Sequence, residues 1–216
     1  MNKQFRKAVV FCNGDLADVS RVRKYIDAKT LIVGCDGGTA HALSLGLTPH
    51  VVIGDFDSIS NKTLRALGGK EVEYLRYPRE KDFTDSELGL MYAKEKGCTD
   101  IILAGVRGTA TDHFLGNLFL IAKKQYRAFN IKIVEGREEM MLLRKHIRIR
   151  GKKGDDVSLI TIGPDAAGVT TKGLFYPLKN AVLKSGTASG IRNRLTGTHA
   201  EITLKKGALL VIHRVS

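Results

Sequence analysis

The chain has 216 residues and a formal net charge of +13, with 43% hydrophobic and 26% charged residues. This composition is ordinary for a folded globular protein and excludes a disordered chain, a collagen-like repeat and a coiled coil. The apolar run 8–12 is too short for a secretory signal peptide, and no run approaches the roughly 18 residues that span a bilayer. We therefore expect a soluble, cytoplasmic protein with no membrane partner.

Short apolar runs alternate with helix-like segments as far as residue 134, which is typical of a parallel sheet covered by helices. In the last predicted helix, Phe114, Leu118 and Ile121 have the spacing of a buried face. The predicted strands are 8–12, 30–34, 51–53, 71–75, 101–104 and 131–134, and the predicted helices are 19–28, 39–45, 61–67, 86–96 and 113–126.

The pattern changes after Gly136 to short β-type runs separated by glycine-containing turns, which predicts a small all-β sandwich. The stretch 144–153 is strongly basic, but its alternation is that of a half-exposed strand and no aromatic residue is interleaved to stack on bases. We therefore favour a solvated strand over a nucleic-acid surface. The expected fold class is α/β, with a Rossmann-like open parallel sheet domain (1–136) followed by a small all-β sandwich domain (137–216).

Acidic residues follow the predicted strands of the first domain. Ligands of open α/β sheets bind beyond the carboxyl ends of the strands, so these carboxylates should converge on one rim. Mg²⁺ suits them, because it takes oxygen ligands and is commonly held by one or two carboxylates together with substrate phosphates. The acids are Asp36, Asp55, Asp57, Asp82, Asp85 and Asp112.

Several of these acids also have a structural explanation. Asp85 and Asp112 can oppose a helix dipole, and Thr84 with Glu87 can form a capping box at a helix start. Asp55 and Asp57 are harder to explain in this way. Alternation in an extended segment would place both carboxylates on one side, where they repel each other unless a cation or protons intervene.

Two weaker signals accompany the acids. In Asp36-Gly37-Gly38-Thr39 the glycines either let the backbone approach an anion at a helix start or simply make a turn. His113 and Asn117 are four residues apart on one helix face, where they either contact a nucleotide or form local hydrogen bonds. No P-loop motif is present, and no Gly-x-Gly-x-x-Gly follows the first strand.

The motifs taken in order resemble those of the thiamin pyrophosphokinase (thiamin diphosphokinase) family. The resemblance continues at 171–178 and at 189–193, so it covers nearly the whole chain. The motifs that carry it are Asp36-Gly37-Gly38, Gly54-Asp55-Phe56-Asp57-Ser58, Lys81-Asp82-Phe83-Thr84-Asp85-Ser86-Glu87, and Asp112-His113 with Asn117.

Members of that family transfer a pyrophosphoryl group from ATP to the thiamin hydroxyl, giving thiamin diphosphate and AMP. They work as homodimers that bind thiamin between the nucleotide domain of one subunit and the sandwich of the other. The resemblance implies the catalytic acids Asp55, Asp57, Asp82, Asp85 and Asp112, of which Asp57, Asp82 and Asp85 would bind Mg²⁺. It further implies nucleotide contacts at Asp36, Gly37, Gly38, Lys81, Thr84, His113 and Asn117, and thiamin contacts at Ser189 and Asn193.

Two positions depart from the family pattern. The family usually has Gly-Gly-Arg-x-Asp-His, but here Ala110 replaces the arginine, and Arg107 is a possible substitute. Gly-x-Ser-Asn appears with Arg192 in place of the serine. The alternatives to the kinase are another Mg-dependent nucleotide phosphotransferase or phosphohydrolase, or a basic nucleic-acid-binding protein; we expect no nucleic-acid partner.

Overall fold

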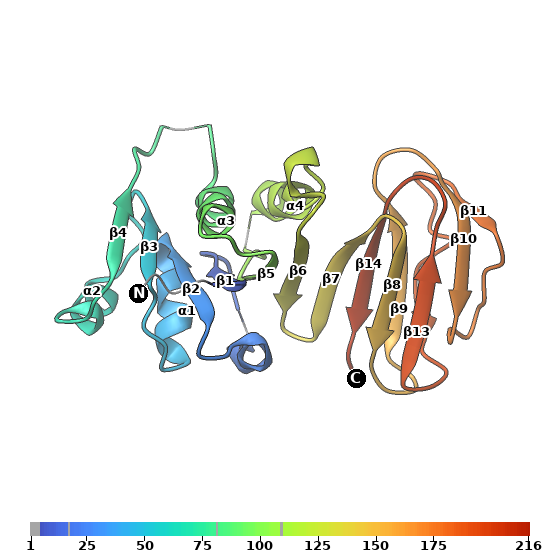
Figure 1. Ribbon diagram of the computed structural model, residues 1–216, viewed down its shortest axis with the longest axis horizontal. Coiled ribbons are helices and arrows are strands. Elements are labelled where there is room, and N and C mark those ends of the chain that lie inside the picture. The colour runs from blue at the N-terminus through green and yellow to red at the C-terminus, as the bar shows by residue number, and fades with distance from the viewer. Residues whose placement is uncertain (1–4, 17, 81, 109) are drawn as a thin grey trace. The chain divides into compact units, whose positions relative to one another are not determined.

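The computed structural model describes residues 5–16, 18–80, 82–108 and 110–216. The chain forms two compact units, Met1–Gly136 and Arg137–Ser216; in Figure 1 the colour runs from blue at the start of the first unit to red at the end of the second. Each unit has its own buried hydrophobic core.

The first unit is arranged around β1 (Lys7–Phe11), whose residues after Lys7 are apolar and buried. It pairs in parallel with β2 (Thr30–Cys35) on one side and with β5 (Asp100–Ala104) on the other. β3 (Val51–Gly54) and β4 (Glu73–Arg76) extend the sheet beyond β2, and β6 (Asn130–Glu135) extends it beyond β5. The order β6-β5-β1-β2-β3-β4 changes direction at β1, so a crevice is expected beyond the carboxyl ends of β1 and β5.

Helices cover both faces of this sheet because its strands are apolar on both sides. Val9 and Phe11 face the core that includes Val22 of the 3₁₀ helix η1 (Val19–Tyr25) and Ala42 of α1 (Thr39–Ser44). On the opposite face lie α3 (Asp85–Glu95) and α4 (Thr111–Leu120), as Figure 1 shows. The remaining helical elements are η2 (Asp36–Gly38), α2 (Asn61–Leu67) and η3 (Lys124–Tyr126).

Two predicted helices differ from the structure. The segment predicted as helix 19–28 is the 3₁₀ helix η1, which ends at Tyr25. The segment predicted as helix 113–126 consists of α4, ending at Leu120, and the separate turn η3. The predicted buried stripe was wrong in part: Ile121 is buried, but Phe114 and Leu118 are only half-buried, because the buried face of α4 carries Asn117 and Leu120.

The second unit contains two antiparallel sheets. One has the order β12-β9-β14-β7, formed by β12 (Asn193–Arg194), β9 (Asp156–Thr161), β14 (Leu209–Arg214) and β7 (Glu138–Leu143). The other has the order β11-β10-β13-β8, formed by β11 (Ala181–Leu183), β10 (Ala166–Lys172), β13 (His199–Thr203) and β8 (His146–Arg150). Residues of both sheets, such as Val157, Val211 and Ile202, share one core.

The basic stretch 144–153 contains β8, which lies at the edge of its sheet. His146, Arg148 and Arg150 are exposed while Ile149 is buried, so the prediction of a half-exposed strand is confirmed. Within the described residues, no helix has the length and apolar character needed to cross a membrane.

Candidate active site

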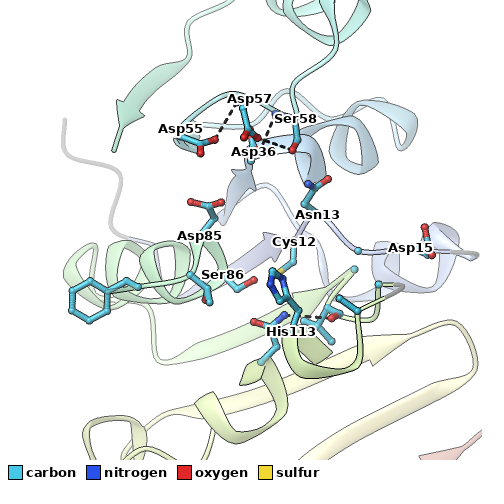
Figure 2. Close-up of a pocket in the computed structure, with 18 of the residues that line it drawn as sticks. Cys12, Asn13, Asp15, Asp36, Asp55, Asp57, Ser58, Asp85, Ser86 and His113 are labelled. Carbon is cyan, nitrogen blue, oxygen red and sulfur yellow. Dashed lines mark hydrogen bonds between the residues drawn. The ribbon is translucent and has the colours of Figure 1, made fainter. Parts of the chain in front are cut away.

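A cavity of about 520 Å³ lies beyond the carboxyl ends of β1 and β5 in the first unit. Its walls are the loops after β1, β2, β3, β4 and β5, the start of α3 and the first two turns of α4. This is the place where the strand order changes direction, and hence where an open α/β sheet binds its ligands. Figure 2 shows Asp36, Asp55, Asp57 and Ser58 on one side of the cavity and His113 on the opposite side of the view.

The floor of the cavity is fixed by backbone hydrogen bonds between the loops that follow β1 and β5. The N–H groups of Cys12, Gly14 and Asp15 donate to the carbonyls of Ala104, Gly105 and Arg107, each at 2.7 Å. A Cβ at Gly14 would lie 2.5 Å from the Gly105 carbonyl oxygen, so the close approach requires glycine. A ligand therefore meets a rigid backbone surface here.

Three carboxylates gather beside this floor. One oxygen each from Asp36, Asp55 and Asp57 can be chosen so that all lie within 4.8 Å of one another. Asp36 is only 3% exposed and accepts a hydrogen bond from the Ser58 N–H at 3.3 Å through Oδ2. Its other oxygen, Oδ1, is buried and has no hydrogen-bond partner among the described residues. The cluster therefore contains a buried hydrogen-bond acceptor, Asp36 Oδ1, for which the described residues provide no donor.

The segment 54–58 reaches this arrangement by turning. The expected extended conformation was wrong, because Phe56 has a φ of 71° and lies in the left-handed region. Its ring packs edge-on against Tyr74, with the centroids 6.1 Å apart. The Asp57 N–H donates to Asp55 Oδ1 at 3.1 Å, and Ser58 Oγ donates to Asp57 Oδ1 at 2.9 Å. Both carboxylates line the cavity despite the different backbone.

The electrostatics of the cluster favour a bound cation. Burial, followed by the nearby carboxylates of Asp85 and Asp55, raises the pKa of Asp36 above its usual value, although hydrogen bonds from Ser58 oppose the shift. Asp85, the first residue of α3, lines the same cavity. Close negative charges of this kind are stabilised by a cation or by protons.

Only some residues of the stretch 81–87 line the cavity. Lys81 lies outside the described residues, Thr84 and Asp85 line the cavity, and Asp82 is exposed and does not line it. Thr84 Oγ1 accepts the Glu87 N–H at 3.2 Å and so caps α3. The carboxylate of Glu87 pairs with Lys123, so only half of the predicted capping box forms.

Of the remaining predicted residues in this unit, His113 and Asn117 line the cavity, whereas Asp112 is exposed and accepts a hydrogen bond from the His113 N–H at 2.8 Å. Gly37 and Gly38 do not line it. Their lack of side chains permits close packing, because a Cβ at Gly37 would lie 2.1 Å from Asn13 Oδ1.

The loop that departs from the family pattern places no arginine in the cavity. Ala110 lines it, while the Arg107 guanidinium lies 5.0 Å from the Phe114 ring centre and is not among the lining residues. A different arginine does line it: Arg79 Nη1 is 3.8 Å from Asp57 Oδ2. Arg79 was not among the predicted site residues, because it lies in a loop and belongs to no motif that would indicate a ligand contact.

Asn13 and Asp15, which line the cavity, were not predicted either. They follow the first predicted strand directly, so the same rule that selected the acids after the other strands would have found them.

In the second unit, Asn193 joins two loops. Its amide oxygen accepts the N–H groups of Tyr176 and Arg194, both at 2.9 Å, and its amide nitrogen donates to the Tyr176 carbonyl at 2.7 Å. Ser189 is exposed and within 3.0 Å of the Thr187 hydroxyl. A separate cavity of about 340 Å³ is lined by Arg192 and Ile191 but not by Ser189 or Asn193.

A parallel α/β sheet with carboxylates at its carboxyl rim, joined in one chain to an antiparallel β unit, defines a class of two-part α/β protein with an acidic ligand site. Residues 22–134 match the family described as "Thiamin pyrophosphokinase, catalytic domain", and residues 144–209 match "Thiamin pyrophosphokinase, vitamin B1 binding domain". The chain belongs to the thiamin pyrophosphokinase family.

Individual relatives agree with this assignment. The chain is 30% identical over 190 residues to thiamine pyrophosphokinase of Bacillus subtilis (strain 168), which covers 87% of this chain and 89% of the relative. A crystal structure of the enzyme from Bacillus subtilis superposes with a TM-score of 0.88 at 27% identity, covering 97% of this chain and 99% of the other. The structure from Geobacillus thermodenitrificans gives 0.82 at 26% identity, covering 97% of each chain. The mixed α/β architecture is confirmed by these structures.

Proposed function

We propose that this protein transfers a pyrophosphoryl group from ATP to the hydroxyl of thiamin, giving thiamin diphosphate and AMP. The observation that carries the proposal is the carboxylate cluster of Asp36, Asp55 and Asp57 in the cavity of the unit that matches the family's catalytic domain. A net charge of +13 together with a local acidic cluster suits a site that holds an anionic nucleotide through a cation.

The residues of the cavity fit Mg²⁺. All the atoms that could bind the metal are carboxylate oxygens. One of them, Asp36 Oδ1, is buried without a hydrogen-bond partner in the described part of the chain. Asp36, Asp55 and Asp57 would hold the ion, with Asp85 at the cavity wall and Asp82 within the adjacent loop. When bound, Mg²⁺ neutralises the polyphosphate charge at a rim that would otherwise repel it.

The chain's own groups align the reactants. The rigid loops after β1 and β5 support the nucleotide, and the Arg79 guanidinium, which lines the cavity, contacts a phosphate oxygen. A cavity carboxylate accepts the proton from the thiamin hydroxyl as the new oxygen–phosphorus bond forms and AMP leaves. Alignment and neutralisation of phosphate charge supply most of the catalysis in reactions of this type.

The second unit would bind thiamin and form the homodimer. Its match to the vitamin B1 binding domain supports the thiamin-binding role. Asn193 would act by holding the loop that carries the exposed rings of Phe175 and Tyr176, because its amide hydrogen bonds already join this loop to Arg194. Ser189 and Arg192 would border thiamin from the neighbouring loop.

The proposal is tested by incubating the purified protein with ATP, Mg²⁺ and thiamin and measuring AMP and thiamin diphosphate by chromatography. Both products should form in equal amounts and should disappear when the metal is chelated. Asp57→Asn should lower turnover by orders of magnitude, whereas Asp27→Asn, which changes an exposed carboxylate paired with Lys7, should leave turnover unchanged. Phosphate or diphosphate release without thiamin would instead identify a phosphohydrolase.

A further inference from the structure

Asn117 is a buried amide in the wall of the cavity. It lies on α4, is 8% exposed, and lines the cavity together with Gly105, Val106 and His113. Its Nδ2 donates to the Val106 carbonyl oxygen at 3.3 Å.

The orientation of this amide is set by chemistry. The Val106 carbonyl accepts hydrogen bonds and cannot donate, so the –NH₂ group of Asn117 must face it and the amide oxygen must face elsewhere. That oxygen is buried and has no hydrogen-bond partner among residues 5–16, 18–80, 82–108 and 110–216. Leaving a buried acceptor unsatisfied is unfavourable, so such an atom in a cavity wall points to a ligand that donates.

The need for a hydrogen-bond donor limits which part of a nucleotide can lie against Asn117. Ionised phosphate oxygens only accept hydrogen bonds, so they would be repelled by the Asn117 oxygen. The carboxylates Asp36, Asp55 and Asp57 belong to the loops after β2 and β3, whereas Asn117 belongs to the wall formed by the β5 loop and α4. The wall near Asn117 also contains no carboxylate among the described lining residues that lie between Gly105 and Asn117.

We propose that Asn117 recognises the nucleoside part of the bound nucleotide, with its amide oxygen accepting a hydrogen bond from the base amine or a ribose hydroxyl. This inference rests on the proposed function, because it requires that a nucleotide occupies the cavity. The carboxylates bind the phosphate end through the cation, and Asn117 selects for the donor at the other end. Asn117 is thus a specificity-determining residue.

The test compares Mg²⁺-dependent binding of four nucleotides by calorimetry, without thiamin. They are ATP, purine riboside triphosphate, 2′-deoxy-ATP and 3′-deoxy-ATP, the last three of which each lack one donor. The unaltered protein should bind one of these analogues about tenfold more weakly than ATP, which corresponds to about 1.4 kcal/mol. Asn117→Leu should weaken ATP binding by a similar factor and should bind that same analogue no more weakly than ATP.

A matched control is Asn130→Leu, the same chemical change at an exposed residue of β6 whose amide donates to Asp100 at 2.9 Å. It should leave all four affinities unchanged, and thermal unfolding should show that both variants are folded. Equal binding of all four nucleotides by the unaltered protein would overturn the role of Asn117 while leaving the proposed function intact. A loss in Asn117→Leu that is equal for every nucleotide would also overturn it. Failure of ATP to bind at all would overturn the proposed function itself, and failure of thiamin to react despite this binding pattern would overturn only the reaction.

Discussion

Asp36 combines three properties that are each unfavourable for folding. It is buried, it has a φ of 49°, and its pKa is raised by burial and by the carboxylates of Asp85 and Asp55. Strained, charged and unsatisfied groups cluster at functional sites because function, and not stability, retains them. Asp36 should therefore limit the stability of the free protein.

This leads to a prediction for Asp36→Asn. The change removes a buried negative charge while keeping an oxygen that can accept the Ser58 N–H, so the melting temperature at neutral pH should stay equal or rise by a few degrees. Turnover should fall at least 100-fold because the cation loses a ligand. Calorimetry and a turnover assay measure the two effects. A variant that unfolds at a clearly lower temperature would mean that Asp36 is a structural residue.

Glu135 does not line the cavity but is hydrogen-bonded to a loop residue that does, Val106. It ends β6, is 6% exposed, and accepts a hydrogen bond from the Val106 N–H in the loop after β5. Burial raises its pKa to about 7, while backbone hydrogen bonds from this loop and the charge of Arg107 limit the shift. The folded protein therefore binds a proton at this residue that the unfolded chain has already released above about pH 4.5.

The consequence is a fall in stability as the pH rises from about 4.5 to about 7, because in this range the folded state holds more protons than the unfolded state. We expect the free energy of unfolding to decrease by about 2–3 kcal/mol between pH 5 and pH 8 through this residue. Glu135→Gln should remove this part of the slope. Urea unfolding of both proteins at several pH values measures the difference, and parallel curves would show that Glu135 does not titrate in this range.

At the scale of an element, α3 lies unusually close to the sheet. A Cβ at Gly89 would be 2.6 Å from Cys35 Sγ and 2.7 Å from Val10 Cγ1, so glycine allows the close approach that places Asp85 at the cavity wall. The position of the Asp85 side chain therefore depends on Gly89, which lies one helical turn further along α3.

Gly89→Ala tests this dependence. Overpacking costs about 1–3 kcal/mol, only part of which is offset by the better helix propensity of alanine, and the shifted helix should also lower turnover. Gly116→Ala in α4 is the matched control. Nothing lies within 4 Å of a Cβ there, so it should stabilise the protein by about 0.5–1 kcal/mol. Chemical denaturation compares the two, and the idea fails if both alanines stabilise.

The bounds of some helices and strands could be predicted from the sequence, and those of others could not. Strands such as 101–104 were found within a residue or two because they are short apolar runs with clear ends. The end of α4 could not be predicted because Ile121 and Ala122 directly after Leu120, and Tyr126 beyond them, continue an apolar pattern past the last helical residue. The place of Asp55 and Asp57 directly after a predicted strand was enough to predict that they lie at the rim. The position of Arg79 and the orientation of Asn117 could not be predicted, because they depend on contacts with residues distant in the sequence.

At the scale of the whole molecule, Asp155 fixes the end of the second unit. Its Oδ1 accepts the N–H of Ser216 at 2.9 Å and the hydroxyl at 2.8 Å, and its Oδ2 accepts Lys152 N–H at 2.8 Å and faces His213 Nε2 at 3.1 Å. Burial tends to raise the pKa of Asp155, but these hydrogen bonds outweigh it and lower the pKa to about 2. Its contribution to stability is therefore lost only as the pH falls below about 3.8 toward 2.

We expect Asp155→Asn to destabilise the second unit by about 2–4 kcal/mol, because an amide cannot accept hydrogen bonds on both sides. Hydrogen exchange should rise across 137–216 and stay unchanged in the parallel sheet of the first unit. Asp156→Asn, which alters the less buried neighbouring residue, should change exchange little. Equal effects of the two substitutions would contradict the role given to Asp155.

The position of β8 at the edge of its sheet affects how readily the protein aggregates at high concentration. An edge strand exposes unpaired backbone groups that can pair with the edge of another molecule and begin aggregation. The guanidinium groups of exposed Arg148 and Arg150 lie along β8, so two such edges would meet with like charges facing each other. The basic residues that suggested nucleic acid thus help to keep the protein dispersed at high concentration.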